Sequence, residues 1–208
     1  MSPAPTRGSA RSEATKQRLF LAAVELIGQR GADAVTVDEI AAAAGVAKGT
    51  VYYNFGSKQE LVQQLLRYGM GLLMARLLGE TDDGAPRPPS SDPLGEVRGM
   101  VRRALEFIAE YPAFVRLWLG EQWRADGTWH ALLSDMRAEV LAEIEAAVRR
   151  IDAVQPLRAG LTPGGVAVAL FGAAFVTGLD RAAFNPQRGL DEAAESVFAL
   201  VRGSLEKR

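Results

Sequence analysis

The side chains best suited to a binding chemistry are gathered between Ala47 and Lys58. This stretch offers an ammonium group, hydroxyl groups and two adjacent phenol rings, which suit base edges, sugars and phosphates in a DNA groove. A glycine within it removes a side chain where a helix must approach DNA closely, at a cost of about 1 kcal/mol relative to alanine. The residues expected to contact DNA on these grounds are Lys48, Gly49, Thr50, Tyr52 and Tyr53.

Capping signals predict the helices that position these side chains. Thr36 and Glu39 have the T-x-x-E spacing of a capping box, so a helix is predicted to begin after Thr36. Its inward face is predicted to consist of Val37, Ile40, Ala41 and Ala44. Gly45 predicts a tight turn before a second helix. In a helix-turn-helix unit this second helix lies in the major groove of DNA.

A further capping signal stands at Ser57 and Glu60. The free N–H groups and partial positive charge of a helix N-terminus attract phosphate, and Lys58 adds a full charge to the same point. We therefore predict a phosphate contact at Lys58. Two interpretations of Thr36 stay open, since a capping residue can act as a cap alone or can also touch a phosphate.

The sequence upstream predicts another amphipathic helix. Its apolar stripe is predicted to be Leu19, Ala22, Ala23, Leu26 and Ile27, and Gly31 follows as a C-terminal cap. Three short helices, with Val51 and Phe55 of the last one turned inward, are predicted to share one core. The resulting helix-turn-helix domain is expected over residues 13–56, preceded by a flexible arm, residues 1–12, that is rich in Ser, Pro, Ala and Arg.

The segment TVDEIAAAAGVAKGTVYYNFGSKQELV, within Thr15 to Leu66, resembles the N-terminal DNA-binding domain of TetR-family transcriptional regulators. The resemblance rests on the capped second helix, the G-V-x-x-G-T-x-Y-x-x-F pattern of the recognition helix, and the S-K-x-x-L start of the next helix. It implies groove contacts by Lys48, Gly49, Thr50 and Tyr52, phosphate contacts by Thr36, Tyr53 and Lys58, and a lesser contact by Asn54. Because Asp38 would repel a phosphate, the helix after Thr36 is expected to contribute little beyond its cap.

Composition narrows the class of protein. The 208 residues are 48% hydrophobic and can bury a sizeable core. The absence of cysteine and the single histidine, His130, leave no thiolate site and no metal cluster, so no cofactor and no enzymatic activity are expected. Residues 1–68 hold eight Lys and Arg against six Asp and Glu, whereas residues 69–208 hold sixteen against nineteen. This small basic excess predicts DNA affinity from placed contacts and dimerisation.

A second all-α domain, for effector binding and dimerisation, is predicted over residues 57–208. It starts with a connecting helix, residues 57–79, and a mobile linker, residues 80–92, dense in Pro, Asp, Ser and Gly. Prolines that suit the first turn of a helix help to place the remaining helices, at 93–110, 112–124, 128–151, 163–184 and 190–205. The total is nine helices without strands. The apolar run from Gly164 to Leu179 is shorter than the roughly 20 residues of a membrane span, so we expect a buried helix in a cytoplasmic protein.

The last two helices are the predicted dimer interface, because small and apolar side chains at helical spacing allow close approach between helices. The residues concerned are Gly165, Ala169, Gly172, Ala173, Val176, Val197, Leu200, Val201 and Leu205. The alternative is that both helices close the core of their own protomer. The resemblance implies pairing in a four-helix bundle. A two-fold dimer would set two reading helices about 34 to 36 Å apart and match a palindromic operator.

Soft and aromatic side chains in the middle of the second domain could line an effector pocket, although aromatic residues at helical spacing are individually more often core than ligand contacts. They are Met70, Met74, Met100, Phe107, Tyr111, Phe114, Trp118, Trp123, Phe171 and Phe175, with Arg103, Arg116, Gln122 and His130 as possible polar anchors. Such a lining favours an apolar or amphipathic small molecule. Its binding is expected to shift the connecting helix and to release the operator.

Two other kinds of protein remain to be weighed. A DNA-binding regulator could have a second domain that answers to a protein partner or to nothing, with its own aromatics filling the cavity. A scaffold protein would not need the side chains of Lys48 to Tyr53. Nothing in the residues separates a repressor from an activator or identifies the operator, the target genes or the effector.

Overall fold

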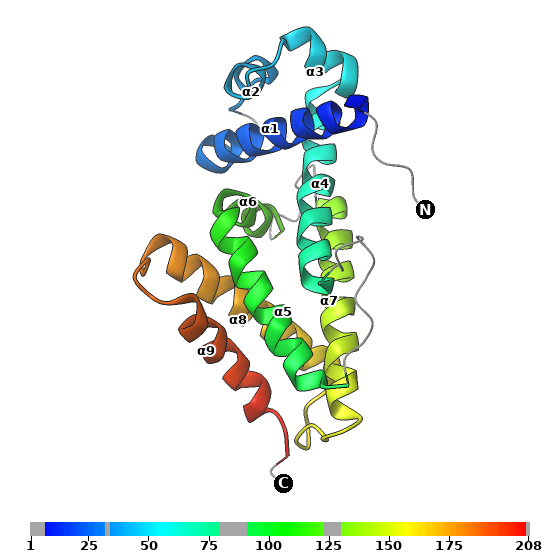
Figure 1. The fold of residues 1–208 in the computed structure, drawn as a ribbon, viewed down its shortest axis with the longest axis vertical. Coiled ribbons are helices and arrows are strands. Elements are labelled where there is room, and N and C mark those ends of the chain that lie inside the picture. The colour runs from blue at the N-terminus through cyan, green and yellow to red at the C-terminus, as the bar shows by residue number, and fades with distance from the viewer. Residues whose placement is uncertain (1–6, 32–33, 80–90, 123–129, 207–208) are drawn as a thin grey trace.

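The computed structural model describes residues 7–31, 34–79, 91–122 and 130–206, and in these ranges it contains nine α-helices and no strand (Figure 1). The N-terminal unit consists of α1 (Arg7–Arg30), α2 (Val37–Ala43) and α3 (Lys48–Phe55). The second domain contains α4 (Lys58–Leu78), α5 (Pro93–Glu110), α6 (Pro112–Gln122), α7 (His130–Asp152), α8 (Pro163–Ala183) and α9 (Leu190–Gly203). The predicted all-α class is confirmed.

The N-terminal unit occupies one end of the molecule, and α4 runs from it into the second domain (Figure 1). α1 lies across α4 and also packs against α6. α5 packs against α4, α7, α8 and α9 and is therefore the central helix of the second domain. One continuous set of buried side chains extends through both domains. The N-terminal unit is thus joined to the rest of the protein by packed helices.

The capping residues identified in the sequence begin the helices as predicted. The Thr36 side chain accepts a hydrogen bond from the backbone N–H of Glu39, and the Glu39 carboxylate accepts one from the backbone N–H of Thr36. Ser57 caps α4 by accepting from the backbone N–H of Glu60 at 3.1 Å. Pro93 and Pro163 occupy the first turns of α5 and α8, where a missing backbone N–H has no helical partner to lose.

The prediction of an arm over residues 1–12 is wrong for residues 7–12, because α1 already begins at Arg7. The last proline of that segment is Pro5, and the residues after it include no helix breaker stronger than Gly8, so composition alone was misleading. Residues 1–6 lie outside the described part, as do residues 80–90 of the predicted linker. Asp92, at the end of that linker, caps α5 by accepting from the backbone N–H of Gly95.

The final helix ends earlier than predicted, at Gly203. The chain then forms an isolated antiparallel bridge between Leu205 and Leu157. The backbone N–H of Arg158 donates to the Ser204 carbonyl at 2.9 Å, and that of Glu206 donates to the Pro156 carbonyl at 3.0 Å. These bonds fasten the end of α9 to the loop between α7 and α8.

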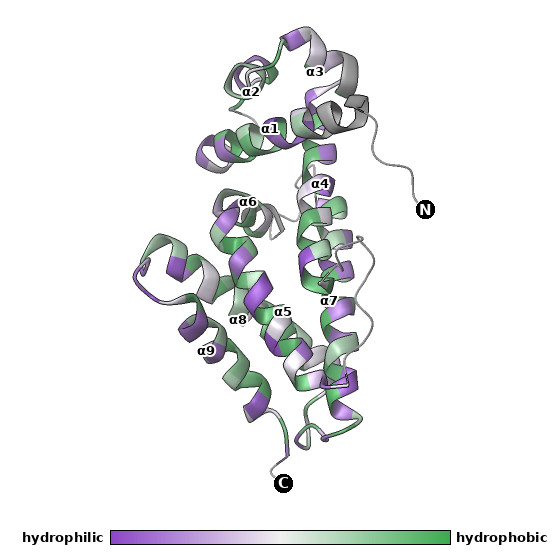
Figure 2. Cartoon of the chain, viewed as in Figure 1, coloured by the Kyte–Doolittle hydropathy of each residue, from purple (hydrophilic) through white to green (hydrophobic). Residues whose placement is uncertain are grey.

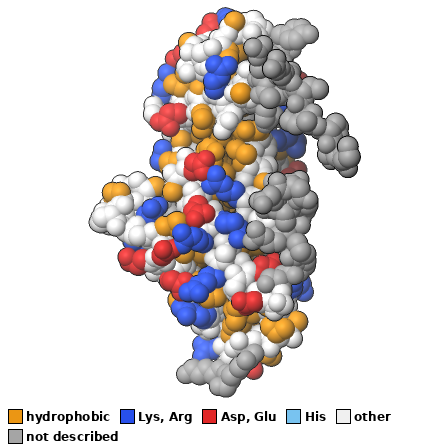
Figure 3. Space-filling view, viewed as in Figure 1, with side chains coloured by type: hydrophobic (Ala, Val, Ile, Leu, Met, Phe, Trp, Pro, Cys, Tyr) orange, Lys and Arg blue, Asp and Glu red, His pale blue; other side chains and the backbone are white. Residues whose placement is uncertain are grey.

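Hydropathy follows the packing, with apolar faces of α4, α5 and α8 turned toward one another (Figure 2). The opposite faces of α5 and α9 carry alternating positive and negative side chains in the space-filling view (Figure 3). Several of these charges are paired between the two helices, including Arg98 with Glu195 at 2.5 Å and Arg102 with Asp191. Positive and negative charges on this face therefore largely offset each other, as is usual for a solvent-exposed surface.

The two domains meet where α4 has a glycine. A Cβ atom at Gly69 would lie 2.6 Å from the ring of Phe20 in α1 and 2.7 Å from the ring of Phe114 in α6. Both rings are fully buried and pack against each other with centroids 5.6 Å apart. Glycine therefore allows three helices from two domains to approach one point.

We predict that Gly69→Ala destabilises the protein by about 1–3 kcal/mol, because the added methyl group overpacks two buried aromatic rings. The measurement is urea unfolding followed by circular dichroism. Gly71→Ala is the matched control on the same helix, since a Cβ there meets nothing within 4 Å. That control should be neutral or stabilising by up to about 1 kcal/mol, because alanine is the better helix former. Equal midpoints for the two variants would contradict the prediction.

Candidate nucleic-acid interface and effector pocket

The N-terminus of α2 is held by a small polar network. The Thr36 hydroxyl donates to Glu39 Oε2 at 2.8 Å, and Arg30 Nη1 donates to Glu39 Oε1 at 2.8 Å. The Arg30 guanidinium and the two bonds from Thr36 lower the pKa of Glu39 to about 2. Because the hydroxyl proton of Thr36 is already engaged, the structure places this residue first as a helix cap. A phosphate contact by Thr36 stays a prediction.

The turn between α2 and α3 has the predicted conformation. Gly45 has φ +64°, in the left-handed region that favours glycine, and Val46 donates its backbone N–H to the Ala41 carbonyl at 3.0 Å. Within α3, Val51 is buried and Phe55 closes the core, as predicted, whereas Tyr52 is 44% exposed. The predicted reading positions Lys48, Gly49 and Thr50 are exposed as well. No atom lies within 4 Å of a Cβ built at Gly49, which leaves open space at that position.

Lys48 has partners that the sequence did not reveal. Its Nζ donates to Asp38 Oδ2 at 2.6 Å and lies 5.8 Å from the centre of the Tyr52 ring. Both charged side chains are 56% exposed. The hydrogen bond with Asp38 holds the pKa of Lys48 above its ordinary value. Asp38 thus forms part of the surface that carries Lys48, and the expectation that α2 adds little to DNA contacts beyond its cap stays a prediction.

Lys58 is the first residue of α4 and is partly buried directly after the Ser57 cap, which is the arrangement predicted for a phosphate contact. Tyr53 and Asn54 are part of α3, but their side chains lie outside the described residues. Their predicted DNA contacts stay predictions. The described face therefore consists of an ion pair, a hydroxyl group, a glycine and an exposed phenol ring.

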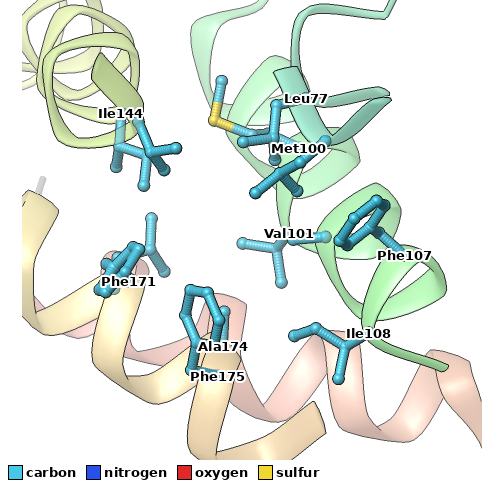
Figure 4. Close-up of a pocket in the computed structure, with 13 residues that line it drawn as sticks. Leu77, Met100, Val101, Phe107, Ile108, Ile144, Phe171, Ala174 and Phe175 are labelled. Carbon is cyan, nitrogen blue, oxygen red and sulfur yellow. The ribbon is translucent and has the colours of Figure 1, made fainter. Parts of the chain in front are cut away.

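An apolar pocket lies between α4, α5, α7 and α8 (Figure 4). No polar atom faces into it, and its volume is about 40 Å³. It is lined by Leu73, Leu77, Met100, Val101, Ala104, Phe107, Ile108, Val140, Ile144, Leu170, Phe171, Ala174 and Phe175. A cavity of this volume can hold a few water molecules but nothing much larger. The lining side chains therefore nearly fill the space between the helices.

Four of the residues predicted to line an effector pocket do so: Met100, Phe107, Phe171 and Phe175. Met70, Met74, Tyr111, Phe114 and Trp118 do not line it. Met70 is buried on α4 near the domain junction, and Phe114 and Trp118 are buried on α6, because helical periodicity cannot separate a core-facing side from a cavity-facing one. Trp123 lies outside the described residues. The aliphatic lining was missed because leucine, isoleucine and valine carry no signal beyond burial.

Among the predicted polar anchors whose side chains the structure describes, Arg103, Arg116 and His130, none lines the pocket. Arg103 donates to the carbonyls of Arg76 at 2.7 Å and Leu77 at 2.8 Å, so it holds the C-terminal end of α4 against α5. Arg116 and His130 are exposed, and the side chain of Gln122 lies outside the described residues. The predicted anchors that the structure describes thus have structural or surface positions.

A chain of aromatic contacts leads from the pocket to the N-terminal unit. Trp118 packs edge-on against Phe175 with centroids 5.1 Å apart and against Phe114 with centroids 6.3 Å apart, and Phe114 contacts Phe20 of α1. The indole Nε1 of Trp118 is buried without a hydrogen-bond partner. Such a group costs about 1–3 kcal/mol of desolvation.

Small and apolar side chains of α8 and α9 form an exposed stripe, which we call the α8–α9 stripe. It comprises the exposed residues Gly165, Val168, Ala169, Val176 and Leu200, together with the half-buried Gly172. Val176 is 68% exposed and Leu200 is 57% exposed. A shallow pocket lies along it between the two helices, lined in part by Leu161 and Ser204. α8 is therefore half exposed, in contrast to the buried helix predicted from its composition.

Three residues predicted for the dimer interface lie inside the protomer instead. Val197 and Val201 are buried on the side of α9 that packs against α5 and α8, and Leu205 is buried at the bridge with Leu157. Ala173 is half-buried at the edge of the stripe. The apolar periodicity of α9 thus reflects the protomer's own core, which was the alternative interpretation of this helix.

Two further features concern the class of protein. α8 runs 21 residues, close to the predicted 163–184, and has the length and composition of a membrane-crossing helix, but 39% of its apolar window is buried within the protein. Core helices of soluble proteins share this length and composition, so these two properties do not by themselves indicate a membrane span. Among the described residues, no group of His, Cys, Asp and Glu could hold a metal ion.

Comparison with known proteins identifies the N-terminal unit. Residues 19–65 match the family model described as bacterial regulatory proteins, tetR family. The transcriptional repressor KstR2 of Mycobacterium tuberculosis is 33% identical over 102 residues, covering 49% of this chain and 48% of KstR2. The chain thus spans about half the length of this relative. The repressor SCO4008 of Streptomyces coelicolor is 32% identical over 139 residues, covering 66% of this chain and 64% of the relative.

Solved structures share the whole fold. The ketosteroid transcriptional regulator KstR2 of M. tuberculosis has a TM-score of 0.70 and 23% identity, covering 93% of this chain and 95% of that one. AibR, solved with isovaleryl coenzyme A and operator DNA, has a TM-score of 0.66 and 21% identity, covering 89% and 97%. At these identities the likeness concerns the fold alone. It extends through the second domain, beyond the residues that the family model matches.

Proposed function

Because the chain belongs to the TetR family of bacterial regulatory proteins, we propose that it binds operator DNA through α3 and represses transcription. The exposed face of α3 carries this proposal. Its core-facing residues are buried, whereas Lys48, Thr50 and Tyr52 are exposed on a short helix that follows a tight turn. These groups can bond to base edges and phosphates in the major groove. The related proteins named as repressors support repression as the output.

We propose further that two protomers pair through the α8–α9 stripe and bind a palindromic operator. An apolar surface of small side chains on two adjacent helices is costly to leave in water and allows close helix packing in a partner. A two-fold axis at this stripe lies at the domain distant from α3, so both reading units remain accessible (Figure 1). Two α3 helices about one DNA turn apart would then meet matching half-sites.

The proposed effector is a neutral apolar or amphipathic molecule that enters the pocket between α4, α5, α7 and α8. The lining offers no charge and no polar atom, so an ionised group placed there would lose its hydration without compensation. AibR, which has the same fold, was solved with an acyl coenzyme A. For this protein, the pocket favours a ligand whose apolar part enters between the helices.

Release of the operator is proposed to follow from enlargement of this pocket. Leu73 and Leu77 of α4 line it, and the other end of α4 follows directly on the reading helix, so an entering molecule would displace the helix that carries α3. A second route runs from Phe175 through Trp118 and Phe114 to Phe20 of α1. Couplings of about 1–3 kcal/mol are typical of allosteric proteins and would lower operator affinity roughly 5- to 150-fold.

The small volume of the pocket favours a second candidate function. A cavity of about 40 Å³ is nearly filled by its own side chains, which is what a regulator without an effector would show. In that case the second domain would serve dimerisation alone. Measurement of effector binding separates the two candidates.

For DNA recognition, we expect the purified protein to enrich a palindromic sequence from a random DNA library. Tyr52→Ala should then weaken binding to that sequence by about 1–3 kcal/mol, since it removes an exposed contact without touching the core. Fluorescence anisotropy of a labelled operator measures the loss. Gln64→Ala, on an exposed position of α4, is the control and should bind like the native protein. No enriched sequence, or equal affinity of the two variants, would refute the proposal.

For dimerisation, Val176→Asp should yield protomers of 22.3 kDa in sedimentation velocity, because pairing would bury two carboxylates at the stripe. Its fold should persist, since Val176 is exposed in the protomer. Val154→Asp is the control, because Val154 is 58% exposed in the loop between α7 and α8, away from the stripe. A dimer that survives the Val176 change would place the interface elsewhere.

For effector binding, we expect 1-decanol as a probe to raise the thermal unfolding midpoint and to lower operator affinity, because it stabilises the form that it binds. Ala174→Leu should abolish both effects of the probe, because the larger side chain takes up the space that the probe would enter. Ala182→Leu, an exposed change at the end of α8, is the matched control. Unchanged operator affinity at saturating probe would reject the release mechanism, and a response to small charged metabolites alone would reject the apolar effector.

A further inference from the structure

The ion pair between α2 and α3 lies on the face proposed to meet DNA. Asp38 is the second residue of α2 and Lys48 is the first residue of α3, so the pair bridges the two helices of the motif across the turn at Gly45. The Nζ to Oδ2 distance is 2.6 Å, and the Tyr52 ring lies beside the ammonium group at 5.8 Å. The face thus presents the Asp38 carboxylate, a hydrogen-bond acceptor, beside the Lys48 ammonium group, which has further donors.

This pairing changes what Lys48 can offer to DNA. A free lysine is a mobile positive charge that favours phosphate, whereas a pair with a carboxylate has no net charge and gains nothing from the general field of the backbone. Asp38 would itself be repelled by a phosphate. One of the three ammonium donors is engaged by Asp38, and two donors remain. The pair therefore suits a surface that presents acceptors and a donor together.

The major-groove edge of one base pair fits this pattern best. A G·C pair presents two acceptors, guanine N7 and O6, followed by one donor, the cytosine N4 amine. The two remaining donors of Lys48 match the acceptors, and the free lone pairs of Asp38 match the amine. An A·T pair presents the same number of groups in the order acceptor, donor, acceptor, so an ammonium group on one side of the carboxylate cannot reach both acceptors while the carboxylate meets the donor between them.

We propose that Asp38 and Lys48 act as one unit that reads a G·C base pair in each half-site, with Lys48 donating to guanine and Asp38 accepting from cytosine. The inference rests on the proposed DNA binding through α3. It assigns Asp38 a role in specificity. The carboxylate lowers affinity for DNA in general and directs the lysine to a base.

The test is selection from a random DNA library with the full-length native protein, Asp38→Asn and Lys48→Ala, followed by anisotropy titrations against salt. The native protein should enrich G·C at one position of each half-site, with a discrimination of roughly 5- to 150-fold against the other pairs. Asp38→Asn should relax that position and strengthen binding to random DNA. Its slope of log K against log salt should steepen by about 0.9 per protomer, because the released lysine takes up a phosphate.

Asp135→Asn is the matched control, since it makes the same charge change on an exposed position of α7 in the second domain. It should leave the base preference and the salt slope unchanged. In the Lys48→Ala background, Asp38→Asn should cause no further loss of discrimination, because the unit is already broken. Unchanged preference and slope in Asp38→Asn would overturn the inference while the proposed function stands. Failure of the native protein to enrich any sequence would instead overturn the proposed function.

Discussion

The absence of a side chain at Gly69 is the constraint on which the arrangement of the two domains depends. Because Phe20 of α1 and Phe114 of α6 both pack directly against this point of α4, the reading unit is locked to the second domain by aromatic contacts rather than by a flexible linker. A displacement of α4 or of α6 must therefore move α1 or strain this packing, since buried rings at native density leave no space to absorb it.

Much of the fold could be predicted from local signals. Most helix starts were predicted correctly from three kinds of signal: the caps at Thr36 and Ser57, the turn at Gly45, and the prolines that open α5 and α8. Caps satisfy a free backbone group at a defined position, and prolines remove one. The predicted start of α1 was wrong because the Ser-, Ala- and Arg-rich composition of the first residues was taken to indicate an arm, whereas the helix already begins at Arg7. The predicted end of α9 was wrong because the chain leaves the helix to form a backbone bridge with a distant segment. Local periodicity does not reveal pairing between distant segments.

The sites were less predictable, for one physical reason. Periodicity tells which side of a helix is apolar, but it does not tell whether that side meets another helix, a cavity or a second protomer. Val197 and Val201 were assigned to a dimer interface and proved to be core, whereas Trp118 was assigned to the pocket and lies behind its wall. The pairing of Lys48 with Asp38 was missed because it joins residues ten apart on two helices, a contact that only the geometry of the turn creates.

The nearly filled pocket also has a consequence for the speed of the response. A molecule cannot enter a space of about 40 Å³ before the surrounding side chains move apart, so for the proposed effector the rate of opening would set an upper limit on the rate of association. Above a certain effector concentration, association should no longer accelerate. A regulator built in this way would ignore brief pulses of its signal and respond to sustained ones.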